Sequence, residues 1–292
     1  MTAQLKNVLA MSAFGTLAVF IRNIEISSME TAFWRGVIAL GVLWLIRKVF
    51  YRKTTVSMDG KERALLFLAG MAVGLNWALL FTAYEHTSVA VATLSYYFAP
   101  VIVIILSPFL FKERMTVFQF ACFVMASLGL VLVIGTSGFG NDGSYLGVLC
   151  GLGAAVFYAS VVLINKVVKN VSGLDRTFIQ FWGAVALLLV VLVTTEGFQI
   201  QNASSKSLAN LLIVGVVHTG LCYWLYFSSI KDMPGQQTAI LSYIDPFVAI
   251  LVSVMVFNET IRPVQAVGAV LILGFTCLYE IRKGGDCIAG NT

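Results

Sequence analysis

The chain has 292 residues, of which 59% are hydrophobic and only 11% are charged. A soluble domain carries about 45–50% apolar and about 25% charged residues, so one soluble core cannot hide this much apolar surface. The composition therefore indicates an integral membrane protein and excludes a soluble enzyme, a collagen, a disordered tail and a nucleic-acid-binding domain. The net charge of +5 is typical of Lys and Arg in cytoplasmic loops.

Apolar runs long enough to cross a bilayer, about 20 residues each, occur ten times along the chain. Runs such as Val101–Phe111 do not alternate, which argues against a β-barrel. The sequence therefore predicts an all-α integral membrane protein with ten transmembrane helices. The predicted spans are 6–24, 29–50, 62–84, 88–111, 115–134, 144–165, 174–194, 208–229, 236–257 and 263–282.

The first run also has features of a signal peptide, because Lys6 precedes a short apolar stretch at Val8–Ile21. No small-residue cleavage site follows it, since the next residues are Arg22, Asn23, Ile24 and Glu25. We therefore expect this run to stay in the protein as its first span.

The distribution of basic residues predicts the orientation. With the N-terminus in the cytoplasm, 15 of the 19 Lys and Arg residues fall on the cytoplasmic side. We expect both termini and the 47–63 loop in the cytoplasm and the 135–143 loop outside.

The two halves of the chain resemble each other at an offset of about 146 residues. The strongest matches are Leu94-Ser95-Tyr96 with Leu241-Ser242-Tyr243, Pro100 with Pro246, Glu113 with Glu259, and Gln119 with Gln265. Because each half has an odd number of spans, the second copy enters the membrane in the opposite direction. Inverted repeats of this kind are typical of transporters.

The repeated segments resemble the EamA repeat of the drug/metabolite transporter superfamily. In the first half the resemblance rests on 87–92, Ala99-Pro100, Lys112-Glu113-Arg114 and 129–132, and in the second half on 241–259 and 266–269. It covers almost the whole chain, as one copy in 1–137 and one in 144–283. It implies ten helices in a five-plus-five inverted arrangement and the export or exchange of a small metabolite. Glu113 and Glu259 match the family's signature acid, although capping of the next helix is an alternative role.

Several intramembrane residues are candidates for a substrate site. Pro100 and Pro246 are predicted helix kinks, either for packing or because the helices bend at the substrate. Asp245 lies near the middle of its span, where a charge costs about 2.5–3.5 kcal/mol, and its repeat partner is Ala99. It is a proton carrier, a cation anchor or a structural carboxyl group. Arg35 either extends its side chain toward the interface, pairs with an acid or binds a substrate carboxylate.

Deep aromatic residues can line a cavity for an aromatic or cationic solute, and core packing is their alternative role. Asn76 and His218 are polar residues within spans, for which hydrogen bonding between helices is the alternative. The predicted substrate-binding residues are Arg35, Asn76, Trp77, Tyr96, Tyr97, Tyr158, Trp182, Tyr243 and Asp245. We expect them around a central cavity formed by spans one to four and six to nine.

These features predict a secondary transporter in the cytoplasmic (inner or plasma) membrane that works by alternating access. The predicted substrate is a small organic metabolite, an amino acid or a related amphipathic solute, moved outward. Efflux of an organic cation or drug is the alternative, followed by a non-transporting membrane scaffold.

The sequence shows no catalytic cluster, metal motif or Walker A motif, so we expect no enzyme activity, no cofactor and no metal. The expected partners are the small-molecule substrate and membrane lipids, with protons as a candidate coupling ion and no nucleic acid. The oligomeric state stays open, with a monomer as one option.

Overall fold

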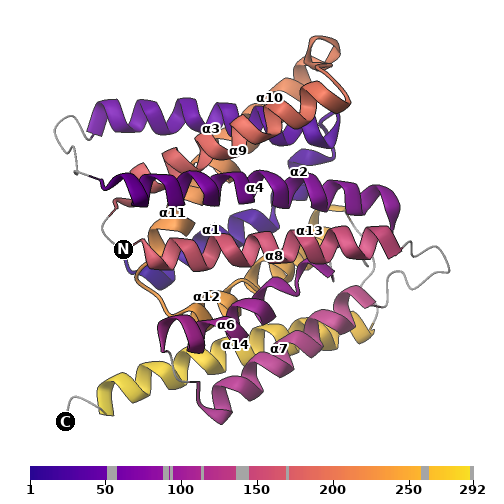
Figure 1. Cartoon of the computed structure of the whole chain (residues 1–292). Coiled ribbons are helices and arrows are strands. Elements are labelled where there is room, and N and C mark those ends of the chain that lie inside the picture. The colour runs from indigo at the N-terminus through magenta and orange to yellow at the C-terminus, as the bar shows by residue number, and fades with distance from the viewer. Residues whose placement is uncertain are drawn as a thin grey trace.

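The computed structural model describes residues 1–50, 58–87, 92, 95–112, 115–135, 145–168, 171–257 and 263–289. These residues form a bundle of helices, and no strand occurs among them (Figure 1). The helices of the first half are α1 (Ala3–Gly15), α2 (Leu17–Ile21), α3 (Ser28–Phe50), α4 (Gly60–His86), α6 (Ala99–Phe111) and α7 (Val117–Gly135). Those of the second half are α8 (Tyr145–Val167), α9 (Gly173–Thr195), the short η1 (Ile200–Asn202), α10 (Ser205–Ile213), the π-helical η2 (Val214–Leu221), α11 (Cys222–Ile230), α12 (Gly235–Leu241), α13 (Ile244–Phe257) and α14 (Pro263–Ala289).

The predicted all-α membrane fold is confirmed. Seven helical segments of the described residues are long and apolar enough to cross a membrane, and three shorter apolar helices overlap the remaining predicted spans. Both termini lie at the same end of the bundle, as an even number of spans requires (Figure 1). Glu113, Glu259 and most of the 135–143 loop lie outside the described residues.

The packing between helices repeats when the two halves are exchanged. The third span contacts the sixth through α4 and α8, and the eighth contacts the first in the same way, through α11 and α1. Likewise, the contact between α4 and α9 corresponds to the contact between η2 and α3. The contact between α6 and α8 corresponds to the contact between α13 and α1. Three further contacts each join equivalent spans of the two halves, namely α3 with α9, α6 with α12, and α7 with α14. This pattern is that of two related halves joined about a pseudo-twofold axis. Because each half has five spans, the second half is inverted relative to the first.

Four predicted spans are interrupted rather than continuous, and the fourth breaks at Tyr97-Phe98, just before α6. The first breaks at Thr16, whose hydroxyl donates to the Ala13 carbonyl at 2.7 Å and so competes with the helix ladder. The eighth contains η2 between α10 and α11. The ninth breaks between α12 and α13, where the Ser242 hydroxyl donates to the Ala239 carbonyl at 2.6 Å.

The expected proline kinks are helix starts instead. Pro100 lies in the first turn of α6 and Pro246 in the first turn of α13, where a missing N–H leaves no hydrogen bond unmade. The carbonyl of Ser242, four residues before Pro246, accepts from the Asp245 N–H at 3.3 Å. The two repeat-related prolines therefore mark two helix breaks.

Glycines bring α4 and α9 into backbone contact. A Cβ atom at Gly70 would lie 1.9 Å from the Gln180 carbonyl oxygen, and one at Gly183 would lie 2.2 Å from the Phe67 carbonyl oxygen. Neither distance is possible for a real atom, so only glycine fits at either position. Close approach through small residues is a general way in which helices associate in membranes.

We expect Gly70→Ala to lower the free energy of unfolding by about 1–3 kcal/mol or more, because the added methyl group forces α4 and α9 apart. Thermal unfolding in detergent measures the change. The matched control is Gly41→Ala in α3, where a Cβ atom would meet nothing within 4 Å. Equal midpoints for the two variants would contradict the close packing of α4 on α9.

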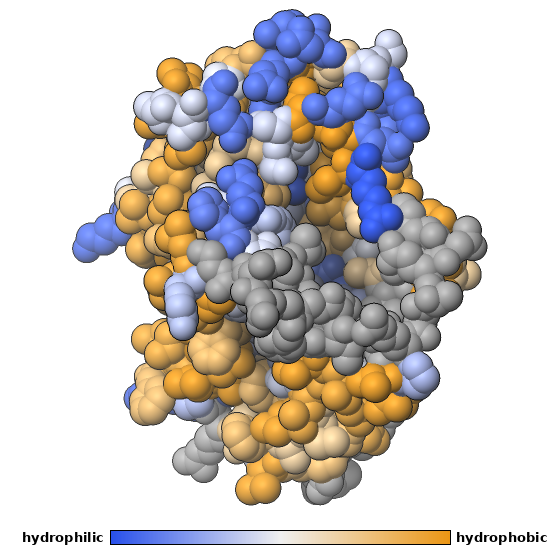
Figure 2. All heavy atoms as spheres, turned by 90° about the vertical axis from the view of Figure 1, so that its right-hand side faces the viewer, coloured by the Kyte–Doolittle hydropathy of each residue, from blue (hydrophilic) through white to orange (hydrophobic). Residues whose placement is uncertain are grey.

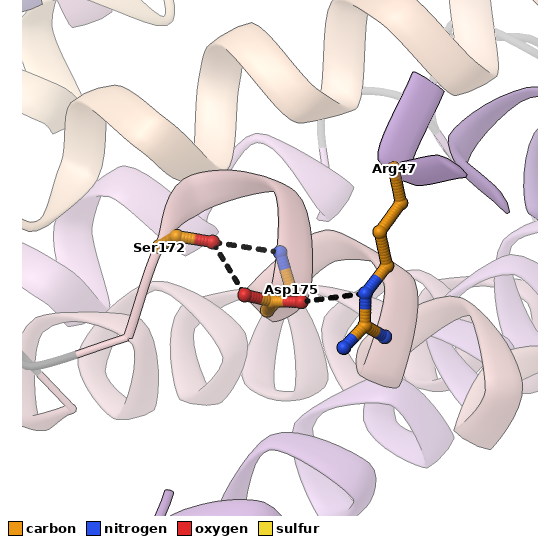
Figure 3. Close-up of polar contacts among 3 residues, drawn as sticks. All are labelled: Arg47, Ser172 and Asp175. Atoms are coloured by element: carbon orange, nitrogen blue, oxygen red, sulfur yellow. Dashed lines mark hydrogen bonds and ion pairs between the residues drawn. The ribbon is translucent and has the colours of Figure 1, made fainter. Parts of the chain in front are cut away.

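An ion pair joins α3 to α9 at the end of the bundle that carries the termini. The Nε atom of Arg47 lies 3.4 Å from Oδ1 of Asp175 (Figure 3). Ser172 caps α9 by accepting from the Asp175 N–H at 3.1 Å, and its hydroxyl donates to the Asp175 carboxylate at 2.8 Å. Because the Arg47 side chain is 43% exposed, this pair contributes at most about 1 kcal/mol.

Two carboxylates hold the opposite end of α3 against the connection between α9 and α10. Buried Glu30 accepts from the backbone N–H groups of Gln199 and Ile200 at 2.9 and 3.0 Å. Glu25 accepts from the Ser204 N–H at 3.1 Å, and hydrogen bonds from Ser204 lower the pKa of Glu25. Figure 2 faces this end of the molecule, where hydrophilic side chains gather toward the top and hydrophobic ones fill the lower part.

Candidate functional site

Seven aromatic rings form a connected group in the middle of the bundle, the central aromatic cluster. Each ring lies 4.9–6.5 Å from at least one other, measured between centroids. The members are Phe14 of α1, Trp77 of α4, Tyr96 and Tyr97 just before α6, Tyr158 of α8, and Tyr223 and Tyr226 of α11. Within the cluster, the Tyr158 and Tyr226 hydroxyls are hydrogen-bonded to each other at 2.5 Å.

Arg35 places a positive charge against one side of this cluster. Its guanidinium carbon lies 3.9 Å from the centroid of the Trp77 ring, a cation–π contact. The Arg35 side chain is only 6% exposed, and its Nε atom has no hydrogen-bond partner in the described part of the chain. Within the described residues no carboxylate pairs with it. A buried cation with an unused donor is an incomplete binding group, because burial without compensation is costly.

Asp245 places a negative charge against another part of the cluster. It lies in the first turn of α13, directly after the break from α12, where the helix dipole favours an acidic group. The Tyr97 hydroxyl donates to its Oδ2 atom at 3.1 Å. No cationic side chain pairs with Asp245 in the part of the chain that the structure describes.

The two charges belong to one site. Arg35 lies on the Trp77 ring and Asp245 accepts from Tyr97, and both rings belong to the central aromatic cluster. Arg35 comes from α3 and Asp245 from α13, and Phe181 of α9 extends the cluster at 5.4 Å from Tyr223. The site thus draws on spans one to four and six to nine, whereas α7 and α14 pack on each other.

Three of the residues predicted from the sequence lie elsewhere. The Asn76 amide donates to the Ala154 carbonyl at 2.8 Å and joins α4 to α8, which is the alternative role expected for it. Trp182 is 53% exposed and contacts Phe178 on the outer side of α9. Tyr243 is fully buried but turns toward α7, where its hydroxyl lies 2.7 Å from Ser127 Oγ. These three side chains are not joined to the central aromatic cluster.

Three members of the cluster were not predicted, namely Phe14, Tyr223 and Tyr226. Tyr223 and Tyr226 are three residues apart and so share one face of α11, which is a signal that sequence reasoning can use. Phe14 offers no comparable signal, because no second aromatic residue lies three or four positions away from it in the sequence.

Comparison with known proteins gives consistent results for sequence and structure. The chain is 28% identical over 289 residues to "Uncharacterized transporter YxxF" of Bacillus subtilis, covering 97% of this chain and 91% of that protein. An "Uncharacterized transporter" of Archaeoglobus fulgidus is 30% identical over 270 residues, covering 91% and 92%. "Solute carrier family 35 member G1" of Homo sapiens is 24% identical, covering 92% and 76%.

A solved crystal structure superposes with a TM-score of 0.84, covering 95% of this chain and 98% of that one at 19% identity, which establishes the likeness of fold. The model of the EamA-like transporter family matches twice, at residues 2–135 and 145–279, in agreement with the two packed halves. The chain therefore belongs to the EamA-like transporter family.

Proposed function

We propose that this transporter carries a small zwitterionic metabolite, an amino acid or a close relative, outward across the cytoplasmic membrane. The observation that carries the proposal is the pair of opposite, unneutralised charges at the central aromatic cluster. Arg35 suits a substrate carboxylate and Asp245 suits a substrate ammonium group. The rings between them suit an apolar side chain and add cation–π attraction for the ammonium.

The energetics favour a substrate that carries both charges. Arg35 is buried and Asp245 is half-buried, and neither has a charged partner among the described residues. A zwitterion supplies a counter-charge to each, whereas a neutral solute supplies neither. The site would therefore select zwitterions over neutral solutes, because a neutral solute leaves Arg35 and Asp245 without counter-charges.

Efflux of an organic cation is the second candidate. Asp245 with the surrounding phenol rings is suitable for a cation, as an aromatic cage is. The buried Arg35 opposes it, because a cation in the same site meets a like charge near Tyr96 and Tyr223.

The mechanism we propose is alternating access without chemical change to the substrate. The helix breaks before α6 and before α13 lie at equivalent positions of the two halves and adjoin the site, as discontinuous helices do in other transporters. Rocking of the halves about this point would expose the site to each side in turn. We place both termini in the cytoplasm, as the basic residues predict.

The test uses purified full-length protein and three versions of one amino acid. L-Leucine carries both charges, leucinamide lacks the carboxylate and N-acetyl-leucine lacks the ammonium group. We expect L-leucine or another of the twenty standard amino acids to raise the melting temperature, and each one-charge analogue to do so less. A ligand at 100 times its Kd adds about 2.7 kcal/mol of stability. Counterflow of the same amino acid in proteoliposomes then shows transport.

The opposite pattern would overturn the proposal. Stabilisation and counterflow by organic cations such as tetraethylammonium, with no response to any amino acid, would favour the second candidate. Binding without counterflow would favour a non-transporting scaffold.

A further inference from the structure

His218 is a buried imidazole that the proposed substrate site does not use. It is 4% exposed and lies in η2, the π-helical part of the eighth span. π-Helical turns are rare and are frequently found at functional sites. η2 packs closely on α3, since a Cβ atom at Gly215 would lie 2.6 Å from Cβ of Ile38. This contact holds His218 beside the helix that carries Arg35.

The hydrogen bonds around His218 define which ring nitrogen carries its proton. The Nε2 atom lies 3.0 Å from the hydroxyl oxygen of Thr16, at the break between α1 and α2. The Thr16 hydroxyl donates its own proton to the Ala13 carbonyl, so it accepts from His218. Nε2 is therefore the protonated nitrogen of the neutral ring. Nδ1 is buried without a hydrogen-bond partner among the described residues, so it is the nitrogen left to take a second proton.

Arg35 is the charged group that acts on this imidazole. It lies on α3, the helix against which η2 packs, three residues before the Ile38 that faces Gly215. The other helices in contact with η2 bring no charged group close to His218. α11 carries the neutral groups Cys222, Tyr223 and Tyr226, and α2 has no titratable residue. The lysines of α1 and α10, Lys6 and Lys206, are at least ten residues along their helices from Thr16 and His218, about 15 Å or more.

We infer that His218 is a proton-binding site whose affinity for the proton depends on the charge at Arg35. While Arg35 is unpaired, a proton on His218 is repelled by a like charge in a medium of low dielectric constant. An anionic group bound at Arg35 cancels that charge and makes protonation easier. Ile213, at the start of η2, offers a backbone carbonyl to the added N–H.

This coupling gives the transporter a place for a proton that is linked to the substrate site. It rests on the proposed function in so far as the anionic group is a substrate carboxylate. By linkage, a carboxylate that favours protonation of His218 binds more tightly once His218 is protonated. The break at Thr16 connects this event to the site, because a side chain at neighbouring Gly15 would collide with the Asp245 carbonyl oxygen.

The test exploits the presence of only two histidines in the chain. His86 is exposed, so His86→Gln leaves His218 as the single imidazole in an otherwise unchanged protein. The measurement is NMR of the full-length protein with ¹³C-labelled histidine in detergent micelles, between pH 4 and 9. We expect one titrating signal, which is absent when His218→Gln is added.

Variants of Arg35 then test the coupling without any ligand. Arg35→Gln in the His86→Gln protein removes the charge, and we expect the midpoint of the titration to rise by about one pH unit or more. Arg35→Lys keeps the charge and should leave the midpoint near its original value. Thr16→Val removes the acceptor of the Nε2 proton and should lower the midpoint, which provides a second test if Arg35→Gln does not fold.

Two results would overturn the inference: a His218 signal that does not titrate, or a midpoint that is the same with Arg and Gln at position 35. Failure of amino acids to bind would contradict the proposed function and leave this titration unaffected. A constant midpoint together with amino acid binding would contradict only the proton site. The two failures are thus distinguishable.

Discussion

Arg35→Gln is expected to weaken amino acid binding by about 30-fold or more. Removing one partner of a buried charge pair costs about 2 kcal/mol at the least, and 1.4 kcal/mol corresponds to a factor of ten in Kd. The effect should be large because Arg35 is 6% exposed and has no other ion partner among the described residues. Isothermal titration calorimetry of purified protein measures the change.

Arg47→Gln is the matched control on the same helix. Arg47 lies twelve residues further along α3, is 43% exposed and pairs with Asp175 at the end of the bundle. Its loss should change the affinity by no more than a few-fold, because exposed ion pairs contribute about 0–1 kcal/mol. Leucinamide has no carboxylate and is a cation, so it should bind the Arg35→Gln variant at least as well as the original protein. Equal losses for both arginine variants would mean that Arg35 acts on stability and not on the substrate.

The number and order of the helices follow directly from the sequence, because lipid requires long apolar segments whose backbone bonds are internal. The interruptions at Thr16 and in η2 could not be predicted in the same way. A serine or threonine hydroxyl can bond to a backbone carbonyl within a helix that stays intact, so its presence does not predict a break. A π-helical turn leaves no mark on the hydropathy of the sequence. Pro100 and Pro246 correctly predicted the positions at which the helices are irregular, although the two prolines begin helices and do not kink them.

The charged members of the site were predictable because a lone charge in a span is expensive wherever it faces. The aromatic members were harder, since a ring on any face of a helix is compatible with lipid, core or cavity. Trp182 and Tyr243 are deep in their spans, yet one faces outward and the other turns to α7. Only the packing of the eighth span against the first and third brings Tyr223 into the cluster.

Asp245→Asn is expected to weaken binding of the same amino acid by about 30-fold or more, through loss of the partner for the ammonium group. Asparagine keeps the size of the side chain and can still accept from the Tyr97 hydroxyl, so α13 should keep its place. Asp245→Glu restores the charge and should recover part of the affinity. Tyr97→Phe removes one hydrogen bond to the carboxylate and should have a smaller effect.

The substrate analogues separate the three roles open to Asp245. If it anchors the ammonium group, N-acetyl-leucine binds Asp245→Asn and the original protein alike, because the acetylated amine carries no charge. If the carboxyl group instead carried the coupling proton, binding would survive in Asp245→Asn, and only accumulation driven by a pH gradient would be lost. A purely structural carboxyl group would leave transport and its pH dependence unchanged and alter only the melting temperature. Because Asp245 starts a helix at a break and accepts from Tyr97 alone among the described residues, we expect the first of these patterns.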